Sequence, residues 1–191
     1  MINVIYDNRH SEDYERLIKE FNEQGCYYKF WEAEVYAHSV VESISASFKK
    51  IITWAKQNEM DEVIIAEQDL FFPSPNSWKY FIENKPKEFG VYIGGSYLID
   101  NRNEYKAPLV KVIEWVGNHL IIVNKTYYDT WLNTNSKLHC DTAQSGLGEF
   151  YLCFPMVALQ RAGFSANHQG NQIVNYNPLI TNTFPEYIYN G

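Results

Sequence analysis

Two carboxylates that follow an apolar run are the first residues in this sequence that could do chemistry. Glu67 and Asp69 come directly after residues 63–66, and Gln68 lies between them. In an extended chain, residues two apart point to the same side, so the two carboxylates would lie together and Gln68 would point away. Paired carboxylates repel each other unless a proton or a cation relieves them, and their oxygens suit Mg²⁺ or Mn²⁺. The simpler interpretation is a pair of solvated carboxylates at a strand end.

The elements that must position this pair alternate between strands and helices. Strands are expected over residues 2–6, 27–31 and 63–66. One helix is expected from Ser11 to just before Gly25, and a second from Ser39, which forms a capping box with Glu42, to about Ala55. This order predicts parallel strands joined by right-handed crossovers, a fold whose ligands collect at the carboxyl ends of the strands.

The later half predicts a mixed continuation of the same α/β domain. Further strands are expected near residues 90–93, 110–114 and 120–123, and helices after Asn76 or Ser77, over residues 125–132 and after Asp141. No linker or repeat divides the chain, so residues 1–191 are expected to form a single domain with a mainly parallel central sheet. Residues 175–191 are expected to be an extended C-terminal tail.

The composition argues against nucleic-acid partners and against a membrane or secreted location. With 16 Lys and Arg against 23 Asp and Glu, the chain has a formal net charge of −7 and no basic run, so nucleic-acid binding is not expected. Neither a transmembrane segment nor a signal peptide is expected. Cys26, Cys140 and Cys153 have no metal-type spacing and are expected to be buried thiols in the cytoplasm. An aromatic content of 16% would suit a binding cleft lined with rings.

Three separate segments resemble one family. The first covers residues 4–9, the second joins residues 43–55 to residues 63–69, and the third covers residues 154–165, with Asp141 ahead of it. Together they are similar to the lipopolysaccharide-type glycosyltransferases of family 25, which have the GT-A fold. The resemblance is spread over roughly residues 2–168.

This resemblance implies a GT-A-like (nucleotide-diphospho-sugar transferase) fold and a metal-dependent hexosyltransferase. A sugar would pass from a nucleotide-sugar donor to a saccharide or glycan acceptor, as in lipopolysaccharide biosynthesis. Glu67 and Asp69 would hold Mn²⁺ or Mg²⁺ in an E-x-D element, while Asn8 and Arg9 would meet the nucleotide.

The chain departs from the family pattern at three positions. Gln68 stands where the family has the middle Asp, Phe48 replaces the His after Ser47, and Ala166 follows Ser165 where the family has Asp. These departures leave two other hypotheses open. One is a sugar- or nucleotide-binding module that lost catalysis, and the other is a structural interaction protein of the same fold.

Further site residues are expected from the second half of the chain. His168 lies in a polar loop where GT-A enzymes often place a third metal ligand; a solvated His is the alternative, and His139 is the competing candidate. Asp141 and Glu149 are the candidates for the general base that deprotonates the acceptor. Asp141 could instead cap the following helix.

Glycines complete the expected site. Gly94 and Gly95 could let the backbone approach a sugar or phosphate closely, and together with Gln68 they are expected to contact the donor, although a plain turn is the alternative. Residues 117–119, Gly-Asn-His, are expected to be a turn first and a site second.

Overall fold

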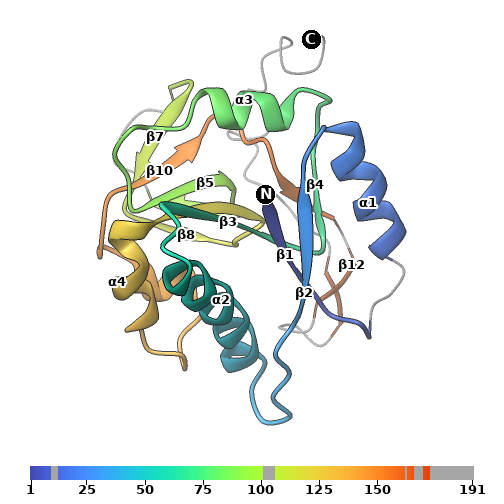
Figure 1. The fold of residues 1–191 in the computed structure, drawn as a ribbon, viewed down its shortest axis with the longest axis vertical. Helices are drawn as coiled ribbons and strands as arrows, with labels where there is room; N and C mark the ends of the chain where they lie inside the picture. Colours follow the sequence, from blue (N-terminus) through green and yellow to red (C-terminus); the bar gives the residue numbers. More distant parts are fainter. Residues whose placement is uncertain (10–12, 101–105, 162, 166–169, 173–191) are drawn as a thin grey trace.

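The computed structural model describes residues 1–9, 13–100, 106–161, 163–165 and 170–172 (Figure 1). Its centre is one seven-stranded sheet with strand order β2-β1-β3-β9-β5-β10-β7. The strands are β1 (Ile2–Tyr6), β2 (Tyr28–Glu32), β3 (Glu62–Glu67), β5 (Val91–Gly95), β7 (Leu109–Val112), β9 (Leu120–Asn124) and β10 (Phe150–Cys153).

Five of the seven strands run in one direction. β1 is parallel to both β2 and β3, and β10 is parallel to β5. β3 and β5 also share this direction, because each is antiparallel to β9, which lies between them. Only β9 and the edge strand β7 run the opposite way. The predicted α/β fold with a mainly parallel central sheet is confirmed.

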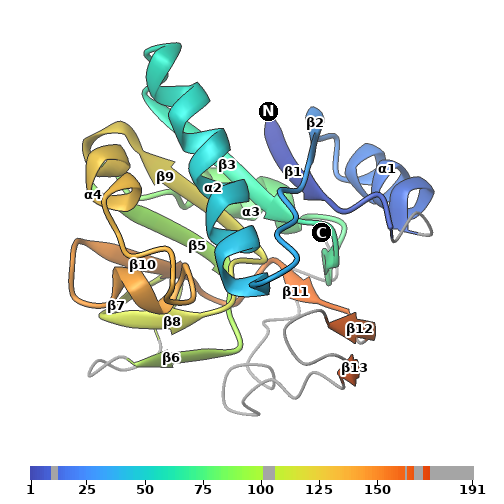
Figure 2. The ribbon, with the colours of Figure 1, turned by 90° about the horizontal axis from the view of Figure 1, so that it is seen from below.

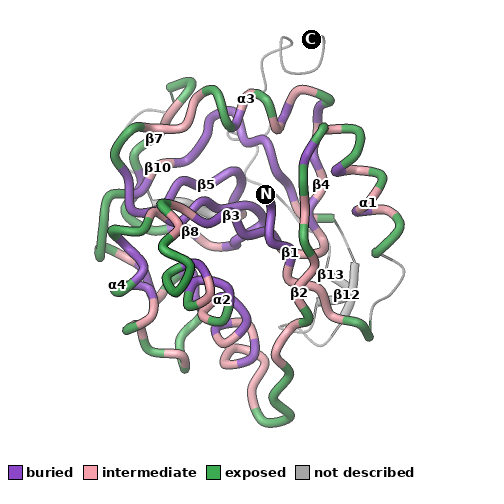
Figure 3. The backbone as a smooth tube through the Cα atoms, viewed as in Figure 1, coloured by how far each residue is buried: buried purple, intermediate pink, exposed green. Residues whose placement is uncertain are grey.

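Helices cover both faces of the sheet (Figures 1 and 2). α1 (Asp13–Glu23) and α3 (Ser77–Glu83) pack on one face, whereas α2 (Val40–Gln57) and α4 (Tyr128–Leu132) pack on the other. β3 shows why: Val63 and Ile65 enter the core beneath α2, while Ile64 and Ala66 enter the core beneath α1 and α3. The strand is therefore buried on both faces, as its uninterrupted apolar run predicts (Figure 3).

A local sequence signal fixes the start of the long helix α2. The Ser39 Oγ accepts a hydrogen bond from the Glu42 backbone N–H at 3.1 Å, so the predicted N-cap is confirmed. On the buried side of the helix, Phe48, Ile51 and Ile52 are fully buried. None of the described helices is both long and apolar enough to cross a membrane.

Short strand pairs and turns frame the sheet. The pairs are β4 (Leu70–Phe71) with β11 (Leu159–Gln160), β6 (Leu98–Asp100) with β8 (Glu114–Val116), and β12 (Gly163–Ser165) with β13 (Gly170–Gln172). A 3₁₀ turn, η1 (Lys125–Tyr127), leads into α4.

Two sequence predictions were wrong in the second half. The strand expected over residues 110–114 is two strands in different sheets, because the chain leaves β7 at Ile113 and starts β8 at Glu114. The helix expected after Asp141 is only a 3₁₀ turn, η2 (Thr142–Gln144), which is soon followed by Gly146 at a φ of 70°. The expected tail, residues 175–191, lies outside the described residues.

Candidate active site

Several chain segments meet at the carboxyl edge of the sheet. β3 ends at Glu67, which stands beside Ile5 of β1, and β9 enters the sheet at this edge with Leu120 beside Ala66. The Glu67 N–H donates to the His119 carbonyl oxygen at 3.2 Å, which extends the pairing by one residue. The edge therefore gathers the polar residues that follow β1 and β3 and those that precede β9.

Glu67 and His119 form the centre of this edge. The His119 Nδ1 lies 3.8 Å from Glu67 Oε2, and the His119 side chain is fully buried while that of Glu67 is 27% exposed. Burial raises the pKa of Glu67 to about 7, and the charge of Asp141 raises it further against a hydrogen bond from the Asn118 backbone. Burial also lowers the pKa of His119 to about 4, although the charges of Asp69 and Asp141 oppose that shift. The histidine is therefore neutral at pH 7.

Asp141 fixes the turn that presents His119. Its Oδ2 accepts a hydrogen bond from the Gly117 N–H at 2.6 Å, and its Oδ1 accepts one from the Thr142 N–H at 2.7 Å. Gly117 has a φ of 100°, and a Cβ there would lie 2.8 Å from the His119 ring. The alternative role of Asp141 as a cap is confirmed, although it caps only the 3₁₀ turn η2.

Asn118 locks the same turn from the other side. Its Oδ1 accepts a hydrogen bond from the Trp115 indole at 2.9 Å, and its Nδ2 donates to the Cys140 sulfur at 3.1 Å. Because Trp115, Asn118 and Cys140 are all buried, this network holds residues 117–119 rigidly against the segment that carries Asp141.

Gln68 and Asp69 lie in the tight turn between β3 and β4. The Gln68 Oε1 accepts a hydrogen bond from the Asp7 backbone N–H at 2.6 Å, so this amide lies toward the end of β1. Asp69 instead accepts a hydrogen bond from the Gln160 side-chain amide, and its carbonyl oxygen accepts one from the Arg161 N–H at 2.9 Å. Residues 67–69 and 154–160, two of the segments on which the family resemblance rests, are therefore neighbours.

The residues expected to meet a nucleotide lie just beyond β1. Asn8 Nδ2 donates to Glu32 Oε1 at 2.7 Å, which ties the ends of β1 and β2 together. The Arg9 guanidinium binds both oxygens of Asp7, and its side chain is 57% exposed. Both lie on the same edge of the sheet as Glu67.

The other expected residues do not join this group. Glu149 precedes β10 and pairs with Lys111. The next residue, Phe150, lies level with Val63 at the start of β3, through the partners Val91 and Val123 in the strands between them. Glu149 is therefore at the amino edge of the sheet, opposite Glu67. This separation from Glu67 could not be predicted, because strand register is not visible in the sequence.

Gly94 and Gly95 lie within β5, and the chain itself fills the space beside them. A Cβ on Gly95 would lie 1.6 Å from the Ala158 carbonyl oxygen, and one on Gly94 would lie 3.0 Å from the Leu120 side chain. The expected close approach of a ligand to these glycines was therefore wrong at Gly95. Its missing side chain admits the segment before β11 instead.

Two histidines were expected as candidate metal ligands. His168 lies outside the described residues, and His139 is exposed. His119, which the sequence suggested as part of a turn first and of a site second, lies at this edge beside Glu67. Its signal was a polar Asn-His pair directly before the apolar strand β9.

The chemistry of these donors suits a divalent cation. Glu67, Asp69 and Asp141 bring three carboxylates within electrostatic reach of one another or of His119, and a cation would relieve the repulsion that helps to raise the pKa of Glu67. In the described part of the chain, however, no three His, Cys, Asp or Glu side chains are already arranged as a set of metal ligands.

Comparison with known proteins places the fold. No protein-family model and no curated protein match this sequence. Among solved structures, A197 from STIV aligns with a TM-score of 0.54 and 10% identity over 92% of this chain and 94% of that one. This likeness shows a shared fold over nearly the whole chain.

Glycosyltransferases are also among the matching structures. An enzyme involved in the glycosylation of the major capsid of PBCV-1 aligns over 68% of this chain and 60% of that one, with a TM-score of 0.41 and 12% identity. A second, the catalytic domain of Drosophila β1,4-galactosyltransferase 7 in complex with xylobiose, covers 72% and 53%, with a TM-score of 0.42 and 11% identity. Activity must be argued from the residues of the site.

Proposed function

We propose that this protein is a glycosyltransferase that moves a sugar from a nucleotide-sugar donor to a saccharide or glycan acceptor. One observation carries the proposal: Glu67 lies 3.8 Å from the buried His119 at the carboxyl edge of the sheet, and the charges of Asp69 and Asp141 act on this pair. This edge is where open α/β sheets bind their ligands. The family 25 resemblance supports a hexosyl donor and a lipopolysaccharide-type acceptor, which belong to the same proposal. A cytoplasmic location also belongs to it and is supported by the three cysteines without metal-type spacing.

The residues at the carboxyl edge would have different roles in binding the metal, binding the donor and activating the acceptor. Glu67 and Asp69 would hold Mn²⁺ or Mg²⁺, with His168 as a further ligand. When bound, such a cation neutralises the diphosphate and so stabilises the leaving nucleotide. Arg9, at the end of β1, would bind the donor's phosphates, and Asn8 would bind the nucleoside. Asp141 would act as the general base, since its two backbone hydrogen bonds hold the carboxylate in one orientation.

A thermal-shift screen tests the proposal. The protein is heated with nucleoside diphosphates and sugar nucleotides, with and without Mn²⁺, because a ligand that binds only the folded state stabilises it by about 2.7 kcal/mol at 100 times its Kd. We expect a rise in Tm that requires Mn²⁺ and is lost in Asp69→Ala. Asp61→Ala, at the other end of β3 and 82% exposed, is the control and should keep the rise. No Mn²⁺-dependent rise with any nucleotide would contradict the proposal.

A binding module without catalysis is the second candidate. It is favoured by the side-chain amide of Gln160, which already donates a hydrogen bond to one oxygen of the Asp69 carboxylate. A cation would have to compete with this amide, which weakens its binding. Mn²⁺-dependent hydrolysis of a sugar nucleotide separates the two candidates: a transferase shows slow turnover, whereas a binding module shows the thermal shift alone.

A further inference from the structure

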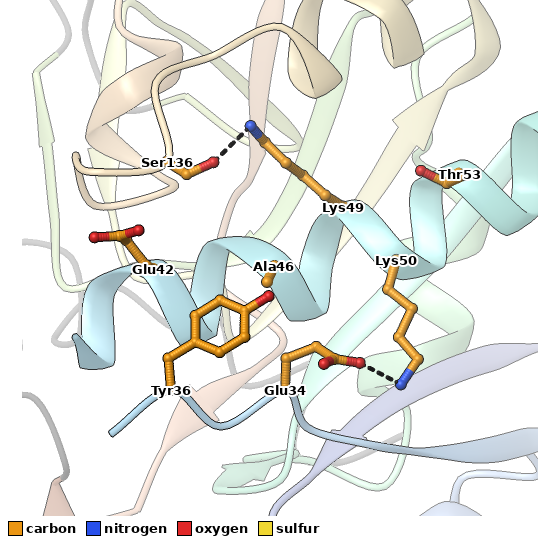
Figure 4. Close-up of a pocket in the computed structure, with 8 residues that line it drawn as sticks. All are labelled: Glu34, Tyr36, Glu42, Ala46, Lys49, Lys50, Thr53 and Ser136. Carbon is orange, nitrogen blue, oxygen red and sulfur yellow. Dashed lines mark hydrogen bonds and ion pairs between the residues drawn. The ribbon is translucent and has the colours of Figure 1, made fainter. Parts of the chain in front are cut away.

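A groove runs along the outer side of α2, apart from the carboxylates at the sheet edge (Figure 4). Its volume is about 510 Å³, within the usual range of small-molecule sites, and it is open to solvent. The floor is the face of α2 that carries Glu42, Ala46 and Lys50. Residues 34–36 form one wall, and the loop that holds Ser136 forms the other.

Serine hydroxyls hold the first wall in place. The backbone N–H groups of Glu34 and Tyr36 each donate a 2.8 Å hydrogen bond, to Ser47 Oγ and Ser43 Oγ respectively. The spacing fits, because two residues of extended chain span about 6.6 Å and four residues of helix about 6 Å. An ion pair of 2.7 Å between Lys50 and Glu34 adds a further contact on this side. The wall is therefore rigid although it belongs to no sheet.

Lys49 holds the second wall. Its ammonium donates to the Thr134 carbonyl oxygen at 2.6 Å and to the Ser136 hydroxyl at 2.9 Å. Both walls are therefore held in place without a ligand, so binding would cost little conformational entropy of the protein.

The lining favours a neutral, polyhydroxylated ligand. Two lysines face two glutamates, so the groove has no net charge to select an anion or a cation, yet it offers fixed donors and acceptors for hydroxyl groups. Tyr36 is 40% exposed as a residue, and its ring can pack against the C–H face of a sugar ring. The small side chain of Ala46 leaves space for a ligand at the floor of the groove between these groups. An apolar ligand would displace water from these charged groups and offer no hydrogen bond in return.

The groove and the sheet edge share one segment of chain. Residues 133–141 supply the wall at Thr134 and Ser136 and then reach the edge, where Cys140 binds Asn118 and Asp141 binds Gly117. We propose that the groove binds an oligosaccharide. On the basis of the proposed function, these are the sugars of the acceptor that extend beyond the one that reacts.

Binding without donor or metal tests the groove by itself. The full chain, fluorescently labelled, is applied to an array of immobilised neutral and acidic oligosaccharides in EDTA. We expect neutral oligosaccharides to be retained, and we expect Ala46→Trp, which fills the floor, to weaken binding about ten-fold or more. Lys19→Trp places the same side chain on the exposed face of α1, where the lysine is 78% exposed, and should bind like the wild type.

The outcomes separate the groove from the proposed activity. If no oligosaccharide binds, or if Ala46→Trp binds as tightly as the wild type, the groove proposal is wrong, whatever the donor does. If Ala46→Trp does not fold, Tyr36→Ala decides by the same measurement, since it removes the exposed ring and leaves the backbone bond to Ser43. Groove binding with no Mn²⁺-dependent response to any nucleotide would support the groove and contradict the transferase.

Discussion

Replacing Glu67 by Gln should reveal a proton linkage that the wild-type protein hides. Glu67 has a pKa of about 7 in the folded protein against an ordinary 4.5, so its stabilising contribution is present below pH 4.5 and is lost as the pH rises through 7. His119 has a pKa of about 4 against 6.5, so its contribution is present above pH 6.5 and is lost as the pH falls through 4.

These two effects cancel over one window. Between pH 4.5 and 6.5, folding takes up one proton at Glu67 and releases one at His119, so the pair adds no slope to the free energy of unfolding. Each proton alone is worth about 1.4 kcal/mol per pH unit. Across the two-unit window, each group alone therefore changes stability by up to about 3 kcal/mol, somewhat less for Glu67 because its side chain is 27% exposed.

Urea unfolding in EDTA, at several pH values across this window, measures the linkage. Relative to the wild type, we expect Glu67→Gln to gain stability as the pH rises and His119→Asn to lose it, with opposite slopes of about 1.4 kcal/mol per pH unit. Glu149→Gln removes an exposed carboxylate at the other edge of the sheet and should keep the wild-type slope. If both variants of the pair also follow the wild-type slope, the two groups are not perturbed in the way that their burial implies.

Three further predictions concern packing, the groove wall and the metal. Gly95→Ala should lower the free energy of unfolding in urea by several kcal/mol, because its Cβ would lie 1.6 Å from a backbone carbonyl oxygen. Gly146→Ala, whose Cβ would have nothing within 4 Å, should lower it by only about 1 kcal/mol, for its positive φ. Equal losses would contradict the clash at Gly95. Ser47→Ala should lower the free energy of unfolding by about 1–3 kcal/mol, because it leaves the Glu34 N–H without its acceptor. It should also weaken oligosaccharide binding on the array. An unchanged Tm and unchanged binding would show that the groove wall does not depend on this hydrogen bond. Gln68→Asp should tighten Mn²⁺ binding modestly in calorimetric titration, since it adds a negative charge beside Asp69; equal affinities would mean that residues 67–69 do not hold the metal.

The strongest local patterns predicted the first half of the fold. The apolar run of β3 predicts burial on both faces, and the Ser39 cap predicts where α2 begins, because both signals depend only on neighbours in the chain. The candidate site residues Glu67 and Asp69 were chosen because they follow the end of β3, at the edge where such sheets bind ligands.

Pairing between distant segments could not be predicted in this way. β10, the strand Phe150–Cys153, was not expected, and nothing in residues 120–124 indicates that β9 inserts between β3 and β5. For the same reason, the sequence did not show that Glu149 lies at the opposite edge of the sheet, nor that the register of β9 brings His119 beside Glu67. Pairing between strands that are far apart in the sequence depends on the whole chain and not on local sequence patterns.

The position of β9 has a consequence for how the chain is made. β3 and β5 leave the ribosome before β9, yet in the finished sheet they are joined only through β9, which lies between them. Until residue 124 has emerged, the nascent protein has only the partial sheet β2-β1-β3, and β5 lacks both of its neighbours because β10 follows β9 in the chain. The β3 and β5 edges that β9 will cover are then apolar and open. We therefore expect a fragment that ends before Leu120 to aggregate rather than fold.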